Sequence, residues 1–223
     1  NAGTYNTAIG YNALNSYAGG GSNNTAIGAN ALANQVSGSW NLAIGAHALY
    51  ECTSCGNNTA IGQDALRYNT TGSVNMGIGI DALEFNTTGS YNTAIGYSAL
   101  SSNTTGINNV VLGNYGLDGV TTGQNNTAVG NHAGQSTNGN NNVLIGYEAG
   151  ANATGSNKLY ISNSSSSNLL YGDFSTGDLS LGKNSGTVTI LNDADIDGTL
   201  TLGTLSDVET SIKTNSTNIS SND

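Results

Sequence analysis

A short phrase recurs along the chain at nearly constant spacing, and this repeat limits the possible folds more than any other feature. The phrase is Asn-x-x-Ile-Gly in most copies, and it ends at nine glycines: Gly10, Gly28, Gly45, Gly62, Gly79, Gly96, Gly113, Gly130 and Gly146. Successive glycines are 18, 17, 17, 17, 17, 17, 17 and 16 residues apart. Stacked equivalent turns require such a constant register, whereas a globular domain does not. The sequence therefore predicts an all-β repeat solenoid of nine rungs.

The positions around each glycine predict how a rung is built. An asparagine stands four residues before every glycine: Asn6, Asn24, Asn41, Asn58, Asn75, Asn92, Asn109, Asn126 and Asn142. Rungs about 4.8 Å apart would let these amides bond to one another as a structural ladder. The residue directly before the glycine is Ile, Leu or Val, and this column is interpreted as a buried aliphatic stack.

The rest of each copy is predicted to form a tight glycine corner, a second short strand through Ala-Leu, and a return loop near Thr-Thr-Gly. Alanine stands three residues after the glycine in most copies, which indicates close approach of backbones. Three or four apolar residues per rung cannot bury their surface within one chain. We therefore expect a homotrimer whose chains pack through their alanine faces.

Composition excludes some function classes. The chain has 223 residues with 32 glycines and no proline, which would suggest disorder if the repeat were absent. Its formal charge is −10, or 3 × −10 = −30 for a trimer, so nucleic acid is not expected as a partner. No apolar run approaches the roughly 20 residues that cross a bilayer, so we expect no membrane contact by this segment.

The phrases Asn6–Gly10, Asn58–Gly62 and Asn92–Gly96, each Asn-Thr-Ala-Ile-Gly, resemble the head repeats of trimeric autotransporter adhesins. This resemblance implies a trimeric left-handed parallel β-roll, here with somewhat longer rungs of about 17 residues. The chain is also similar to bacteriophage tail fibres, in which such repeats run into segments like 157–161, 170–174 and 196–202.

The tail-fibre resemblance implies a structural and adhesive shaft in the virion that contacts the bacterial cell surface for host recognition. Its expected partners are a bacterial surface polysaccharide or another surface receptor, together with other fibre or virion proteins. The alternative is a trimeric adhesin on the bacterial cell surface. What flanks the segment would distinguish the two.

Three domains are expected. Residues 1–156 form the repeat domain, and residues 157–204 alternate apolar and polar side chains as in a β neck or small β-domain. Residues 205–223 begin a coiled coil, because six residues are spaced 3, 4, 3, 4 and 3 apart: Leu205, Val208, Ile212, Asn215, Ile219 and Asn222. By resemblance to adhesin stalks, Asn215 and Asn222 are expected to ring chloride; no other cofactor is expected.

Metal or redox chemistry has weak support. Cys52 and Cys55 have the spacing of half a zinc site, but a local disulfide or free thiols fit better. His47 and His132 share one repeat position but lie five rungs apart, roughly 24 Å at about 4.8 Å per rung.

Acidic pairs and loops also lack a complete site. Asp64 and Asp81 occupy equivalent places on adjacent rungs, where solvation or a bridging cation must relieve their repulsion. Residues 193–198 open like a calcium loop, but Thr204 stands where a bidentate glutamate is needed. The repeat presents no paired carboxylates and no Ser-His-acid set in a cleft, so we expect no enzyme; a depolymerising tailspike is the alternative.

Aromatic side chains are the candidate ligand contacts. Trp40 and Tyr91 stand directly before the ladder asparagine, and Tyr50 and Tyr68 lie towards the return loop. Rings beside polar side chains suit a glycan, which is the first choice of ligand; the alternative is that these rings only cover rung edges. A ladder of threonines, which suggests ice binding as a further alternative, is formed by Thr71, Thr88, Thr105 and Thr122.

Overall fold

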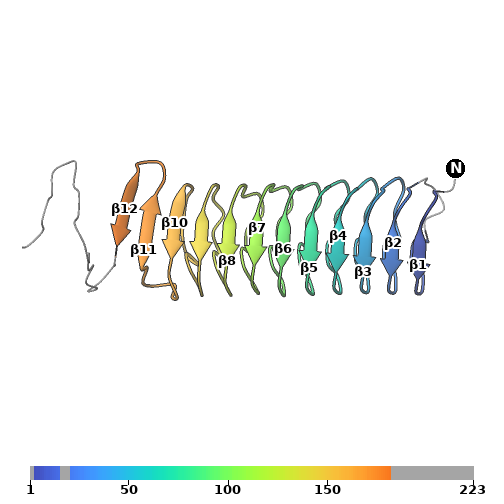
Figure 1. The fold of residues 1–223 in the computed structure, drawn as a ribbon, viewed down its shortest axis with the longest axis horizontal. Helices are drawn as coiled ribbons and strands as arrows, with labels where there is room; N and C mark the ends of the chain where they lie inside the picture. Colours follow the sequence, from blue (N-terminus) through green and yellow to red (C-terminus); the bar gives the residue numbers. More distant parts are fainter. Residues whose placement is uncertain (1–2, 16–20, 182–223) are drawn as a thin grey trace, which may run out of the picture. The chain divides into compact units, whose positions relative to one another are not determined.

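The computed structural model describes residues 3–15 and 21–181, and in these residues the chain is all-β without a helix. Twelve strands form one sheet in sequence order (Figure 1). The strands are β1 (Thr7–Ile9), β2 (Thr25–Ile27), β3 (Leu42–Ile44), β4 (Thr59–Ile61), β5 (Met76–Ile78), β6 (Thr93–Ile95), β7 (Val110–Leu112), β8 (Thr127–Val129), β9 (Val143–Ile145), β10 (Lys158–Ile161), β11 (Leu170–Asp173) and β12 (Asp178–Leu181).

Strands β1 to β9 are parallel and pair with equivalent residues opposite one another, as in Ala43 opposite Ala60. Each strand is the three-residue segment that precedes a repeat glycine. The chain therefore makes one turn per repeat, and the predicted solenoid of about nine turns is confirmed. No helix of the described part is long and apolar enough to span a bilayer.

The sheet continues past the ninth rung into the segment that we assigned to a neck. Strand β10 pairs parallel to β9, and β11 and β12 then add antiparallel. Lys158 and Asp173 face each other across β10 and β11 and form an ion pair, which lowers the pKa of Asp173 to about 2. The expected coiled coil, Asn215, Asn222 and the calcium-like loop lie outside the described residues.

The core of the solenoid is made by one strand residue per rung and, from the second to the seventh rung, by an Ala-Leu or Gly-Leu pair. In β2 to β9 only the middle residue of each strand is buried, as for Ala26 in β2. The leucines of the pairs are fully buried: Leu32, Leu49, Leu66, Leu83, Leu100 and Leu117. The prediction of a second strand through Ala-Leu was wrong, because these leucines adopt φ values of 48° to 54° in a turn. The left-handed backbone directs each leucine inward.

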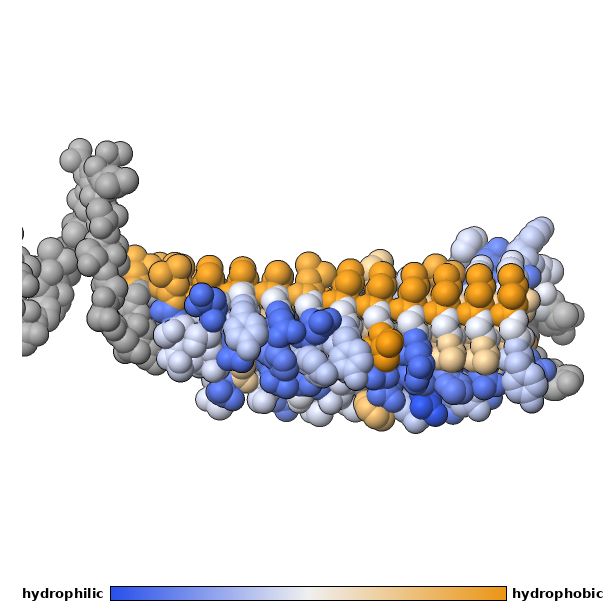
Figure 2. Space-filling view, turned by 90° about the horizontal axis from the view of Figure 1, so that it is seen from below, coloured by the Kyte–Doolittle hydropathy of each residue, from blue (hydrophilic) through white to orange (hydrophobic). Residues whose placement is uncertain are grey.

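The prediction of a buried isoleucine column was also wrong for the single chain. Side chains alternate between the two faces of a strand, so burying the middle alanine turns the residue before the glycine outward. Ile95 and Leu112 are 36% and 40% exposed. Figure 2 shows a hydrophobic row along the solenoid. We call it the isoleucine stripe, and it comprises Ile9, Ile27, Ile44, Ile61, Ile78, Ile95, Leu112, Val129 and Ile145.

The alanine faces cannot pack against other chains as we expected, because these alanines are already buried inside their own chain. Ala48, Ala65 and Ala99 have no exposed surface. The apolar side chains that the sheet leaves exposed are instead those of the isoleucine stripe and of strand residues such as Met76 and Val110.

Candidate functional site

The constant spacing of the ladder asparagines along the chain has a structural cause. All of them after Asn6 are buried in the described residues. Asn75 is typical: its Oδ1 accepts a hydrogen bond from the Asn92 backbone N–H at 3.0 Å, and its Nδ2 donates to the Gly89 carbonyl at 2.8 Å. Direct bonds between neighbouring amides are longer, as from Asn92 Nδ2 to Asn75 Oδ1 at 3.3 Å. The side chains of the ladder therefore bond mainly to backbone groups of strands and loops, and less to one another.

A second buried ladder escaped the sequence analysis. Asn86 Nδ2 donates to Asn69 Oδ1 at 2.7 Å, and Asn103 Nδ2 donates to Asn86 Oδ1 at 2.7 Å. Each amide also donates to the glycine carbonyl three residues later, as from Asn69 to Gly72 at 2.9 Å. The signal was the phrase Asn-Thr-Thr-Gly, of which we had used the threonines and the glycine but not the asparagine.

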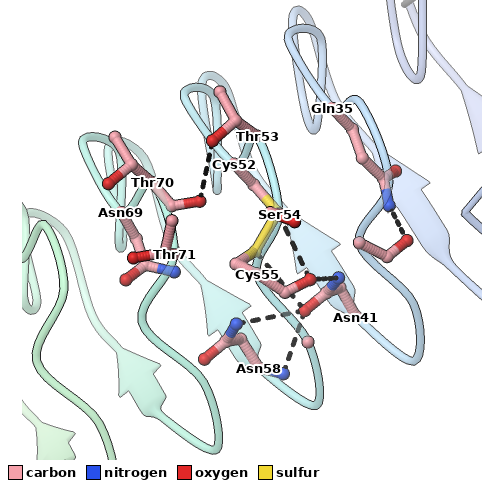
Figure 3. The surroundings of a disulfide bond; sticks show 12 residues. Gln35, Asn41, Cys52, Thr53, Ser54, Cys55, Asn58, Asn69, Thr70 and Thr71 are labelled. Carbon is pink, nitrogen blue, oxygen red and sulfur yellow. Dashed lines mark hydrogen bonds between the residues drawn. A yellow bond between two sulfur atoms is a disulfide. The ribbon is translucent and has the colours of Figure 1, made fainter. Parts of the chain in front are cut away.

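In the rung before Asn69, a disulfide takes the place of this asparagine and its glycine. Cys52 and Cys55 stand at the same two repeat positions as Asn69 and Gly72 (Figure 3). Both cysteines are fully buried. The bond closes the return loop covalently where neighbouring rungs use a side-chain hydrogen bond, so it is structural and leaves no thiol for metal binding.

The Asn–Gly pair and the disulfide pair are predicted to be interchangeable only when both residues of a pair are replaced together. A Cβ added at Gly72 would lie 2.3 Å from Asn69 Oδ1, so asparagine at the first position requires glycine at the second. We expect Cys52→Asn with Cys55→Gly to fold with little loss of stability. Cys52→Asn alone should melt at a lower temperature than the double variant. The new asparagine side chain would overlap the Cβ of Cys55, which costs about 1–3 kcal/mol of folding stability. Thermal denaturation checks the order, and equal melting temperatures would contradict it.

The ionisable side chains of the repeat domain gather on one edge of the solenoid. Every Asp, Glu, Lys, Arg and His of residues 1–156 stands two, five or six residues after a repeat glycine. We call this set the ionisable edge, and it comprises His47, Glu51, Asp64, Arg67, Asp81, Glu84, Asp118, His132 and Glu148. The strands and return loops of residues 1–156 thus carry no ionisable residue of these types, which sequence reasoning had not recognised.

Asp64 is the buried centre of this edge. Its Oδ1 lies 3.3 Å from both His47 Nδ1 and Arg67 Nη1, and its Oδ2 accepts a hydrogen bond from Gln63 at 2.9 Å. Burial, and then the charge of Asp64, raise the pKa of Asp81 on the next rung. The described residues contain no group of three or more His, Cys, Asp or Glu side chains arranged to hold a metal ion. The arrangement is an ion-pair network along the rungs.

Tyr50 and Tyr68 lie on this edge with their rings already in contact with neighbours. Tyr68 stacks on Phe85 with centroids 5.3 Å apart, and the Arg67 guanidinium lies over the Tyr68 ring at 4.9 Å. Tyr50 makes an edge contact with His47 at 5.7 Å. The ring contacts therefore stabilise successive rungs and leave less free ring surface for a ligand.

Trp40 and Tyr91 lie apart from that edge, in the column directly before the ladder asparagines. They are 63% and 62% exposed, and neither belongs to an aromatic pair within the described residues. The structure thus separates our four candidate ligand contacts into two pairs. Of these four candidates, only Trp40 and Tyr91 have rings without an aromatic partner among the described residues.

The threonine ladder lies on the return loops. Its members Thr71, Thr88, Thr105 and Thr122 are exposed. The backbone N–H groups of Thr70 and Thr71 both donate to the Thr87 carbonyl, at 2.9 and 3.2 Å. The Gly72 N–H also donates to this carbonyl, at 3.3 Å. Three successive donors on one acceptor mark a bend, so these threonines stand on a bend of the return loop and not in a strand.

No family model, curated protein or solved structure matches the chain. Its function is therefore argued from the arrangement of the isoleucine stripe, the ionisable edge and the free rings.

Proposed function

We propose that the chain forms the shaft of a homotrimeric adhesive fibre, of the phage tail-fibre kind, that contacts a bacterial surface and performs no catalysis. The observation that carries the proposal is the separation of the isoleucine stripe from the ionisable edge. A continuous exposed apolar row marks an interaction surface, and charged residues are depleted from the centres of such surfaces. Burying the stripe against equivalent stripes leaves the ionisable edge in water.

The repeat gives the proposed interface its form. Because the stripe repeats with each rung, identical chains aligned side by side would match their side chains along the whole length. Closed cyclic symmetry among identical subunits is the usual way to satisfy such a surface. A trimer, followed by a β neck and a trimeric coiled coil, is the form that the sequence resemblance favours.

A bacterial surface adhesin is the second candidate. The disulfide supports both candidates, because such bonds persist at virion and cell surfaces and are rare in the cytosol. Neither candidate requires an active site, and partners are a surface polysaccharide or other receptor together with the proteins that flank the shaft.

The interface is tested by adding one negative charge to the stripe. We expect the parent chain to have three times the mass of one chain in light scattering at micromolar concentration. Ile61→Glu should dissociate or aggregate, because it places a charge in an apolar interface. Ser101→Glu, which adds the same charge at a half-buried position of the ionisable edge, should remain trimeric. A folded monomer of the parent chain would refute the proposal.

A further inference from the structure

The column directly before the ladder asparagines demands an unusual backbone. Its residues have φ values between 57° and 62° from Asn23 to Asn141, a left-handed conformation that asparagine tolerates well. Asparagine occupies most of the column: Asn23, Asn57, Asn108, Asn125 and Asn141. Four rungs depart from this pattern and carry Tyr5, Trp40, Val74 and Tyr91, and the last three lie within four successive rungs.

Val74 is the clearest departure. A β-branched residue at a φ of 59° is strained, by about 1–3 kcal/mol. Its side chain is 45% exposed, so burial within the chain does not offset the strain. Residues held in such conformations gather at binding sites, where the side chain serves another purpose.

These residues form a defined row with Asn57. Trp40, Asn57, Val74 and Tyr91 occupy one position on four successive rungs, so the two rings lie roughly 14 Å apart at about 4.8 Å per rung. The rings offer apolar faces, and the exposed Asn57 amide between them offers a donor and an acceptor. Sugars carry both an apolar C–H face and hydroxyl groups, and this row complements both.

The charge distribution around the row indicates which chemical class of ligand it can bind. The row lies outside the ionisable edge, so no Asp, Glu, Lys, Arg or His stands in its column. An anionic sugar would find no counter-charge there and would face a chain of formal charge −10. The row therefore favours an uncharged ligand.

The same column shows where the row ends. Asn108 Nδ2 donates to Asn125 Oδ1, and Asn125 Nδ2 donates to Asn141 Oδ1, both at 3.1 Å. These amides bond to each other and offer less to a ligand than the isolated Asn57. Tyr91 is the last member of the column with a free apolar side chain.

We propose that the row from Trp40 to Tyr91 binds a neutral polysaccharide lying along the solenoid, with sugar rings on Trp40 and Tyr91, Val74 between them, and Asn57 bonding a hydroxyl. This rests on the proposed adhesive function and names its ligand class. Weak contacts repeated on three chains would gain strength through high effective concentration.

The test measures binding and stability on the same variants. Native electrophoresis is run through gels containing dextran, mannan or galactan, with polygalacturonate as the anionic comparison. The parent trimer should be retarded by at least one neutral polymer and not by polygalacturonate. Trp40→Asn and Tyr91→Asn should weaken the retarding interaction about tenfold. Val74→Asn should weaken it too, while raising the melting temperature by relieving strain. Phe85→Ser, on the ionisable edge, should leave it unchanged.

Each other result overturns the proposal. Retardation by none of the neutral polymers, or equal retardation of parent and variants, removes the site from this row. Loss of the trimer in Val74→Asn shows that a partner chain covers the row instead. The proposed function as a trimeric adhesive shaft is refuted separately if light scattering shows the parent chain to be a folded monomer.

Discussion

Replacing Gly79 by alanine is expected to cause a large loss of stability for the addition of a single methyl group. Gly79 has a φ of 136°, and a Cβ there would lie 2.3 Å from the Gly96 carbonyl oxygen of the next rung. Backbone strain and overpacking together cost about 3 kcal/mol or more per chain. For a chain of this size that lowers the melting temperature by about 6–12 °C.

Gly56→Ala is the matched control for this prediction. A Cβ at Gly56 meets only the Ser39 carbonyl oxygen, at 3.3 Å, and Gly56 has no left-handed φ. The same methyl group should therefore change the melting temperature little. Equal melting temperatures for the two variants would show that the corner glycines do not set the spacing of the rungs.

The repeat could be predicted from sequence because its cause is local and recurs. Gly79 and Gly96 mark the corner whose close approach excludes any side chain, so their period counts the rungs directly. Asn75 and Asn92 recur for the same reason, since each bonds the backbone of its neighbour. A constraint that every rung repeats leaves a periodic trace in the sequence.

The inward and outward faces could not be assigned in the same way. Strand β6 has three residues, too few for alternation to show which face is buried. Ile95 has a core residue's chemistry but lies on the outside, because Leu100 fills the interior from a left-handed turn. The hydrophobic pattern alone cannot distinguish such an exposed apolar column from a core.

The candidate ligand contacts were separable only by geometry. Tyr68 and Tyr91 look alike in sequence, as aromatic residues near loops. Tyr68 is stacked by Phe85, whereas Tyr91 has no ring partner in the described residues. Stacking between rungs depends on which side chains share a repeat position and on the direction in which each side chain points. The repeat in the sequence reveals the shared position but not the direction.

Asn75→Leu is expected to destabilise the chain through groups on two other segments. It removes the acceptor of the Asn92 N–H and the donor to the Gly89 carbonyl, and both residues are buried. Each buried group left without a partner costs about 1–3 kcal/mol, hence about 2–6 kcal/mol per chain. The melting temperature should fall accordingly, and the Asn92 amide should exchange its hydrogen faster.

Asn131→Leu makes the same substitution at a half-buried position outside both ladders, and it should melt close to the parent. The comparison separates the loss of buried hydrogen bonds from the effect of adding a leucine. Because the Asn75 side chain bonds backbone groups of a strand and of a loop, its removal should loosen the rung on both sides of the corner at once. If Asn75→Leu and Asn131→Leu melted together, the ladder would contribute nothing to the stacking, and the corner glycines and the leucine core alone would hold the rungs.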